Sequence, residues 1–475
     1  MDDAMKISQT KVMALMGCLF SLEVSANQVS FLQAWEIVQS NNQSLAAERA
    51  QVQAYRHFES ATSSLHLPSI SLGANYVRLD DDVTVSGHQL MDATTIPGLV
   101  GGSSDALAGL LPIIGGIETH IADRDIFTSS VRAVWPVFTG GRISAAQSAA
   151  EGRTEEAKSH YAMELQARYE DLSRYFFSVV LAREVLRTRQ AVEVGLAQHL
   201  EFAVKLEQQG QIAKVERLQA QASLDKAKVE TRKAQTQLVI AQSALDKIMS
   251  IEGSAMPQEV LFINQHLPPM QAYIEQTLST YPGLALLSAK EKQASSMIKA
   301  ERGKYLPEVY LFGDYSLHED DTLASQLKPD WMVGIGVSVP LTDSSGRRHN
   351  IRAAKSLVQS VKLLQTQAHH DLSMLVQKTY LEAQQAIDEV IGLESSIALA
   401  QENLRLRERA FKQGLSSSID VVDAQLYLAS IQTQQSVARY SYLIGLTRLL
   451  AVSSQMETFT HYQQTAYTHS TQESV

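Results

Sequence analysis

Three stretches of the chain alternate apolar residues with small or polar ones, the period-two pattern of a β-strand with two different faces. The segments 70–76, 127–135 and 331–339 show this alternation, and Gly334 and Gly336 occupy small positions in the last of them. Strands of about 10 residues are long enough to cross a bilayer when tilted. A small soluble sheet with one buried face would give the same pattern, so the strands alone leave both interpretations open.

Two longer stretches, 143–208 and 350–413, have apolar residues at helical spacing and contain no proline. Helices of this length are unstable alone and need coiled-coil partners. Gly210 and Gly414 follow them, and glycine supplies a turn conformation that other residues avoid. We therefore expect the chain to turn back at each glycine. The resulting helical hairpins would span about 143–249 and 350–450.

A further helix is expected ahead of each group of strands, at about 31–65 and 271–304. Pro68 and Pro307 follow these two segments. Because proline cannot continue a helix, each proline should end its helix and begin the first strand.

The chain carries the same unit twice. Leu67–Tyr76 reappears as Leu306–Tyr315, and Trp135–Arg142 reappears as Val339–Arg347. The interval from Pro136 to Gly210 and the interval from Pro340 to Gly414 are both 74 residues. Such matched spacing indicates a duplication. We expect a first repeat at 27–250 (strands about 68–138), a linker at 251–270, a second repeat at 271–450 (strands about 307–341) and a polar, mobile tail at 451–475.

The strands of the two repeats are joined differently. The first repeat has a long glycine-rich loop at about 86–125, and the second has a short one at about 318–330. Four strands leave two open edges, and an open edge cannot lie in lipid. We expect symmetric copies to close the sheet, and three chains would give twelve strands.

The N-terminus resembles a secretory signal. Lys6 and Lys11 precede an apolar run at 12–22, and Val24–Ala26 resembles the small-x-small site of signal peptidase, so residues 1–26 are expected to be a signal peptide. Two alternatives stay open: a buried N-terminal helix, and a lipoprotein modified at Cys18, the only cysteine. The formal net charge of -10 argues against nucleic acid as a partner, because phosphate binding needs a basic face.

The sequence shows no catalytic constellation, so we expect no enzyme, no cofactor and no metal site. His369 and His370 are adjacent and do not share a helix face, so we interpret them as solvated. The run Asp80–Asp82 fits a charge cluster at a strand end better than a calcium site. No segment matches a phosphate loop or zinc-ligand spacing.

The chain resembles the TolC-type outer-membrane efflux proteins. The resemblance covers about residues 30–450 and is carried by the duplication, by the passage Trp135–Arg142 and above all by the segment Phe411–Gln425. It implies a mainly α fold with a membrane β-barrel: a homotrimer whose 12-stranded barrel in outer-membrane lipid continues as a periplasmic α-helical barrel. It also implies the outer membrane of a Gram-negative bacterium, with a large periplasmic part.

The resemblance assigns a gate to Asp420 and Asp423, which lie three residues apart on one helix face. Three copies would stack two carboxylate rings near the periplasmic entrance, where they could select cations and bind a blocking multivalent metal. Such proximity should raise some of their pKa values. From the residues alone, Asp420 could instead simply cap the return helix.

The hairpin tips are expected to contact a periplasmic adaptor and to form the entrance. In well-known family members, a tyrosine and an arginine in the second tip lock the entrance against an aspartate and a threonine in the first. Here Phe411 and Ser416 stand opposite Glu216 and Val215, so those bonds cannot form; Lys412 and Lys214 are possible substitutes near Glu216. The predicted tip residues are Gly210, Glu216, Phe411, Gly414, Leu415 and Ser416.

The function that these features favour is the exit duct of a tripartite export system, docked onto a periplasmic adaptor and an inner-membrane transporter and passing drugs or other small molecules. A duct for type I protein secretion is the alternative within the same class. A periplasmic adaptor and a structural coiled-coil protein are the alternatives from other classes. Adaptors usually carry one hairpin, and a coiled-coil protein would not explain the glycine-rich strands.

Overall fold

The computed structural model describes residues 28–86, 118–253, 255–320, 325, 329–342 and 344–472. The expected signal peptide with Cys18, and residues 87–117 of the expected glycine-rich loop, lie outside this part. The chain divides into two compact units that do not follow the repeats, since each unit takes segments from both. Gln53–Glu155 and Ala289–Lys362 form one unit, and the remaining described residues form the other.

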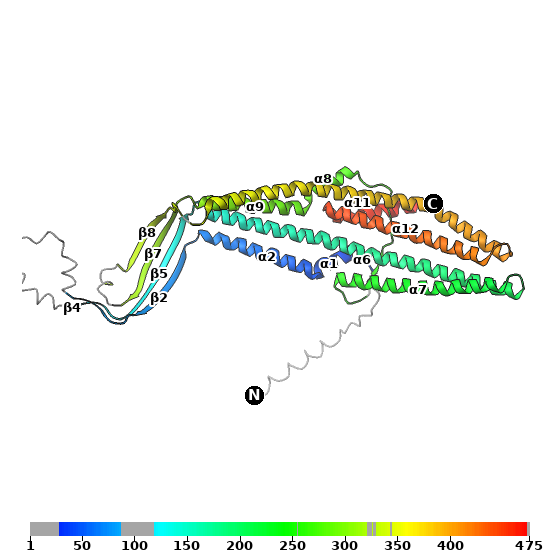
Figure 1. The fold of residues 1–475 in the computed structure, drawn as a ribbon, viewed down its shortest axis with the longest axis horizontal. Coiled ribbons are helices and arrows are strands. Elements are labelled where there is room, and N and C mark those ends of the chain that lie inside the picture. The colour runs from blue at the N-terminus through cyan, green and yellow to red at the C-terminus, as the bar shows by residue number, and fades with distance from the viewer. Residues whose placement is uncertain are drawn as a thin grey trace, which may run out of the picture. The chain divides into compact units, whose positions relative to one another are not determined.

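The first of these units contains a four-stranded antiparallel sheet (Figure 1). Its strands lie in the order β2-β5-β7-β8, so that β2 and β8 are its edges. Strand β5 pairs with β7 and thereby joins the two repeats. The strands are β2 (Ser69–Arg78), β5 (Asp125–Phe138), β7 (Glu308–Glu319) and β8 (Trp331–Ser338).

The alternation expected from the sequence gives this sheet two different faces. On one face the register aligns Leu72 with Val131, Val131 with Tyr315, and Tyr315 with Trp331. We call this the apolar face. Its most exposed members are Ile70, Leu72, Tyr76, Trp331, Val333, Ile335 and Val337, each more than 60% exposed. On the opposite, polar face Arg132 and Asp314 are register partners and form an ion pair of 3.1 Å.

Two short paired strands lie at the ends of the expected loop of the first repeat. Strand β3 (Val83–Ser86) ends where the loop at 86–125 was expected to begin, and β4 (Glu118–Ala122), its antiparallel partner, lies inside that segment. A register shift falls between Val83 and Thr84.

Each expected N-terminal helix of a repeat is in fact two helices. Asn42 separates α1 (Phe31–Asn41) from α2 (Gln43–Ser63), and Tyr281 separates α8 (Met270–Thr280) from α9 (Pro282–Gly303). Both separating residues have an extended conformation. The Asn42 side chain accepts hydrogen bonds from the amides of Ser44 (3.0 Å) and Leu45 (3.2 Å), which restarts the helix. Pro282 explains the second break, because a residue before proline disfavours helix.

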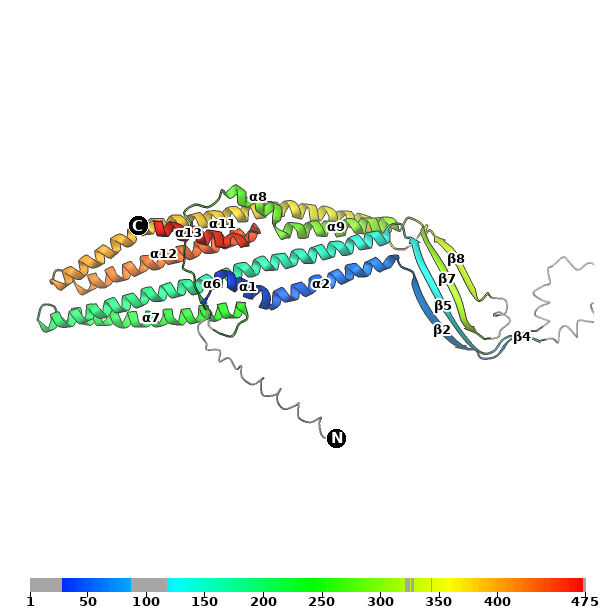
Figure 2. The same ribbon diagram turned by 180° about the vertical axis from the view of Figure 1, so that it is seen from behind.

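Four long helices supply the hairpins. They are α6 (Arg142–Gln208), α7 (Lys214–Met249), α11 (Arg347–Lys412) and α12 (Ser418–Val452). Figure 2 shows α7 returning along α6 and α12 returning along α11. Within the described residues, no helix combines the length and the apolar character that crossing a membrane would require.

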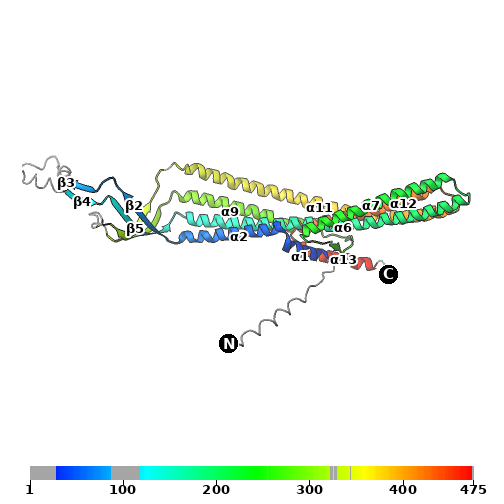
Figure 3. The same ribbon diagram turned by 90° about the horizontal axis from the view of Figure 1, so that it is seen from below.

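The linker and the tail are parts of the second unit's core, which corrects the expectation of a mobile tail. Residues 456–472 form a short 3-10 turn, η2 (Met456–Thr458), and α13 (Phe459–Gln472), whose first residue contacts the first residue of α1 (Figure 3). Phe459 is 3% exposed, and its ring centroid lies 4.7 Å from that of Phe31. In the linker, Phe262 is also buried, and β6 (Met256–Pro257) pairs with β1 (Gln28–Val29). These apolar side chains hold both segments, because their burial removes a large area from water.

Candidate functional site at the helical tips

Both hairpin tips turn through the same backbone motif. Gly210 and Gly414 have φ values of +70° and +72°, the left-handed region that glycine adopts freely. In each tip the glycine amide donates to the carbonyl three residues earlier, at 2.9 and 3.0 Å. The next amide donates to the carbonyl five residues earlier, at 2.9 Å in both tips. This is a Schellman motif, and it satisfies the last carbonyls of α6 and α11.

The carboxylate of Asp420 closes a capping box at the start of α12. Ser417 is the N-cap, and the Asp420 carboxylate accepts from the Ser417 amide (2.9 Å) and hydroxyl (2.7 Å). The Ser416 hydroxyl donates to the same oxygen at 3.0 Å, and Arg407 lies 3.5 Å from the other oxygen. The Ser417 hydrogen bonds lead these contacts in lowering the pKa of Asp420, with Ser416 and Arg407 adding to the effect. The single chain therefore holds Asp420 charged, opposite to the direction expected for stacked carboxylates.

Asp423 differs from Asp420 although it lies only one turn further along α12. Its side chain is exposed, and it has no hydrogen-bond or ion-pair partner among the described residues. Asp420 thus has a structural task within its own helix, whereas Asp423 has none that the single chain reveals.

Glu216 joins the first tip to the second. It lies in the first turn of α7, and its carboxylate accepts a hydrogen bond of 2.7 Å from the backbone amide of Ser418 in the first turn of α12. That amide is one of the donors that a helix start leaves without an internal partner, and a negative charge there is favourable. A carboxylate of one repeat therefore stabilises the helix start of the other.

A buried histidine contacts the same serine, Ser418, that Glu216 binds. The Nε2 atom of His199, on α6, is 2.7 Å from the Ser418 hydroxyl oxygen, and both side chains are buried. The His199 ring stacks obliquely on Phe411, with centroids 4.5 Å apart. Burial lowers the pKa of His199 to about 4, although the Glu216 charge opposes the shift. The imidazole is therefore neutral near neutral pH.

The other predicted tip residues separate into inner and outer positions. Phe411 is 2% exposed and packs inside the tip, whereas Leu415 is 77% exposed and Val215 is 63% exposed. The proposed substitutes for the missing lock do not act as ion pairs in the described chain. Lys412 lies 4.3 Å from the centroid of the Phe202 ring instead, and neither Lys412 nor Lys214 pairs with Glu216.

Two residues of the tip, Ser417 and His199, were not predicted, although the sequence contains a signal for each. Ser417 and Asp420 have the Ser-x-x-acid spacing of a capping box. His199 continues an apolar stripe of α6 at alternating steps of three and four residues, which predicts a buried position. The other members of that stripe are Val192, Leu196, Ala203 and Leu206, and all are buried.

Residues 35–250 and 273–454 match the model of a family described as "Outer membrane efflux protein". The chain belongs to this family. Membership confirms the predicted resemblance and places the chain in the outer membrane of a Gram-negative bacterium. It also confirms the prediction that the chain is not an enzyme, since the family is one of channels.

Curated relatives align with limited identity. The chain is 22% identical to protein CyaE of Bordetella pertussis, over 54% of this chain and 56% of that protein. It is 24% identical to the outer membrane efflux protein BepC of Brucella suis, over 51% of this chain and 52% of BepC. For the outer membrane protein TolC of Vibrio cholerae the identity is 22%, over 63% and 70% of the two chains. The chain thus spans about half the length of the first two relatives.

Solved structures share the fold along nearly the whole chain. The chain resembles CusC with a TM-score of 0.72 at 16% identity, covering 90% of this chain and 92% of CusC. It resembles the CmeC outer membrane channel of Campylobacter jejuni with a TM-score of 0.66 at 14% identity, covering 90% and 86%. The mainly helical fold with strands is therefore confirmed.

Proposed function

We propose that this protein is the outer-membrane exit duct of a tripartite export system and passes small molecules from the periplasm to the exterior. The apolar face of the sheet carries the proposal. Side chains such as Leu72, Val333 and Ile335 are more than 60% exposed there and form a continuous surface across all four strands. An apolar surface of this kind is costly in water and favourable against lipid.

The proposal includes a homotrimer, and the edges of the sheet support it. Strands β2 and β8 have one partner each within the described sheet, so each leaves a row of backbone groups unpaired. Such groups cost several kcal/mol each in lipid, by order of magnitude. Pairing β2 of one chain with β8 of the next satisfies them, and three chains close a sheet of twelve strands around the polar face.

The tips would then form the periplasmic entrance and contact a periplasmic adaptor, which connects the duct to an inner-membrane transporter. The exposed side chains of Val215 and Leu415 supply apolar contact area beside the two glycine turns. Asp423 from three chains would form a carboxylate ring at this entrance, and Asp420 a second ring. Such rings favour cations and offer a site for a multivalent metal.

The conductance of single channels in a planar bilayer tests this function. We expect small cation-selective events from the purified protein, blocked by a trivalent metal ion such as hexaamminecobalt. Asp423→Asn should abolish the block and reduce selectivity while it leaves the capping box of Asp420 intact. Asp420→Asn should weaken both as well, and additionally destabilise the start of α12.

Asp225→Asn is the matched control, because Asp225 is another exposed aspartate on a return helix, α7. It should leave the block unchanged. A trivalent block that survives removal of both Asp420 and Asp423 charges would refute the gate and keep the duct. Folded, membrane-inserted protein that conducts no current would refute the duct itself.

A further inference from the structure

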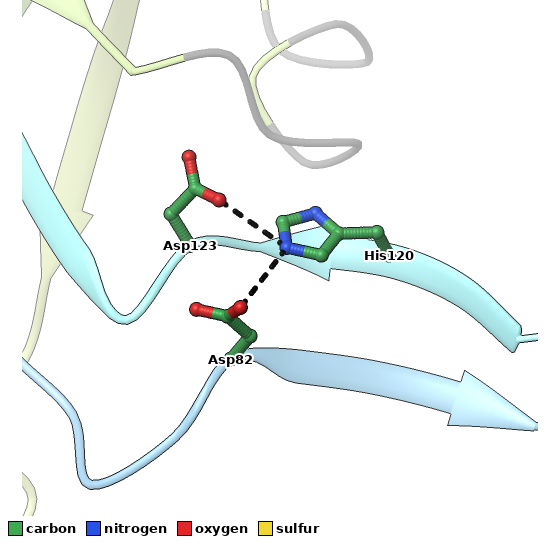
Figure 4. A group of neighbouring side chains, drawn as sticks. All are labelled: Asp82, His120 and Asp123. Atoms are coloured by element: carbon green, nitrogen blue, oxygen red, sulfur yellow. Dashed lines mark ion pairs between the residues drawn. The ribbon is translucent and has the colours of Figure 1, made fainter.

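A second cluster of ionisable side chains lies far along the sequence from the tips, where the four-stranded sheet passes into the β3–β4 hairpin. Asp82 immediately precedes β3, His120 lies in β4, and Asp123 follows β4 (Figure 4). The Nε2 atom of His120 is 3.2 Å from Oδ1 of Asp123 and 3.8 Å from Oδ2 of Asp82. One oxygen or nitrogen atom from each side chain lies within 4.8 Å of the others.

The backbone directs these three side chains to one point. The register shifts between Val83, which pairs with Ala122, and Thr84, which pairs with His120. The extra residue on β4 is a bulge, a feature that redirects neighbouring side chains. The backbone amide of Arg124 also donates to Oδ1 of Asp82 at 2.8 Å, which orients the carboxylate and leaves Oδ2 facing the imidazole. Hydrogen bonds of this kind commonly fix metal-binding carboxylates.

Among the described residues, no basic side chain compensates the charge of this cluster. The neighbouring Arg78 and Arg124 both pair with Asp125, at 3.6 and 3.7 Å. No lysine or arginine of the described residues forms an ion pair with Asp82 or Asp123. Two carboxylates therefore face one imidazole, which carries a full charge only when protonated.

We propose that Asp82, His120 and Asp123 bind a zinc ion. Zinc takes imidazole nitrogen and carboxylate oxygen at about 2.0–2.2 Å, so two ligands of a tetrahedral zinc lie about 3.4 Å apart. The 3.2 and 3.8 Å separations bracket that value. Water completes the coordination, because all three side chains are exposed to solvent. Calcium and magnesium fit less well, since they prefer oxygen ligands throughout.

The ion would stabilise the connection between the four-stranded sheet and the β3–β4 hairpin. The last register pair of β2 and β5 is Arg78 with Asp125, and the first pair of β3 and β4 is Val83 with Ala122. Four residues separate the two pairs on the longer side, between β2 and β3, and two residues separate them on the shorter side, between β4 and β5. One ion held by Asp82 from the longer side and by His120 and Asp123 from the shorter side would fix the bend that this difference produces.

The test is isothermal titration calorimetry of the full-length protein in detergent with zinc chloride, using a purification tag without histidine. We expect one zinc ion per chain, with binding weakened at least about tenfold in His120→Ala and in Asp82→Asn/Asp123→Asn. His318→Ala is the matched control. His318 is likewise an exposed histidine paired with an aspartate, Asp320 at 3.2 Å, but no third ligand group joins the pair within the part of the chain that the structure describes. It should bind zinc as the wild type does.

Three outcomes would overturn the proposal. The first is no stoichiometric zinc binding by the wild type up to about 1 mM, which would leave a simple ion-pair cluster. The second is equal zinc binding by the wild type and by folded His120→Ala and Asp82→Asn/Asp123→Asn proteins, which would place the ion elsewhere. The third is displacement of zinc by an equal concentration of calcium, which would remove the imidazole from the ligand set.

Discussion

At the scale of single residues, the tip contains two carboxylates in equivalent places with different tasks. Glu216 and Asp420 are each the third residue of a return helix, and the same 204 positions separate them as separate Gly210 from Gly414. Asp420 closes a capping box on its own helix, whereas Glu216 reaches the helix start of the other repeat. The difference follows from the cap position, which is Ser417 in the second repeat and Ala213 in the first.

The buried His199 gives this link a pH dependence. Its pKa is about 4 in the folded chain and near 6.5 in the unfolded chain, so the unfolded state binds the proton more tightly. Stability should therefore be full above pH 6.5 and fall as the pH drops from 6.5 to about 4, by up to about 3 kcal/mol per chain. Thermal unfolding followed by circular dichroism across this range measures the effect.

His199→Gln supplies the control for this prediction. Glutamine keeps a polar group near the Ser418 hydroxyl and cannot take up a proton in this range. The variant should be less stable at pH 7 and should lose less stability on acidification than the wild type. An equal loss in both proteins would assign the acid sensitivity to other groups.

At the scale of elements, the backbones of the two repeats are in close contact where the turn between β5 and α6 meets the end of α9. Gly140, between β5 and α6, and Gly303, at the end of α9, touch through their backbones. A Cβ atom on Gly303 would lie 2.6 Å from the Gly140 carbonyl oxygen, and one on Gly140 would lie 2.4 Å from the Gly303 carbonyl oxygen. Neither backbone can move without displacing its own helix or strand.

Gly303→Ala should therefore destabilise the protein by about 2 kcal/mol, the usual cost of adding a methyl group to a filled site. The midpoint of thermal unfolding measures the loss. Gly73→Ala on β2 is the matched control, because a Cβ there meets no atom within 4 Å, and it should leave the midpoint nearly unchanged. Equal midpoints for the two variants would mean that the backbones of Gly140 and Gly303 can move apart without a loss of stability.

At the scale of the whole molecule, the core recruits segments from both ends of the chain. Phe31 from α1, Phe177 from α6 and Phe262 from the linker meet around Phe459 of α13. The linker and the C-terminal segment are therefore parts of the hydrophobic core.

Phe459→Ala should cost about 3–5 kcal/mol, the range for removing a buried aromatic ring. It should also expose α13 to proteolysis, which limited digestion followed by mass spectrometry would detect. His461→Ala, an exposed position on the same helix, should do neither. A Phe459→Ala protein as stable and as resistant as the wild type would show that α13 docks through other contacts.

The repeats, the hairpins and the alternating strands were predictable because their patterns extend over many residues. The helix break at Tyr281 could also be predicted from Pro282. The break at Asn42 could not, because asparagine is a polar residue that also occurs within helices. The burial of Phe459 was not predicted, since its segment is mostly polar and its few apolar residues, such as Tyr462 and Ala466, form only a short pattern. The hydrogen bond from Ser418 to Glu216 spans 202 residues and depends on how the two hairpins pack.

The alanine at the start of α7 has a consequence for symmetry. In the proposed trimer six return helices begin around one entrance, and their backbones approximate a sixfold ring. Only the three α12 helices have a side-chain cap, from Ser417; the three α7 helices have Ala213 at the cap position and no such hydrogen bond. The entrance would therefore be a threefold ring of stiff and loose segments in alternation, and the segments around Gly210 should be the first to move apart.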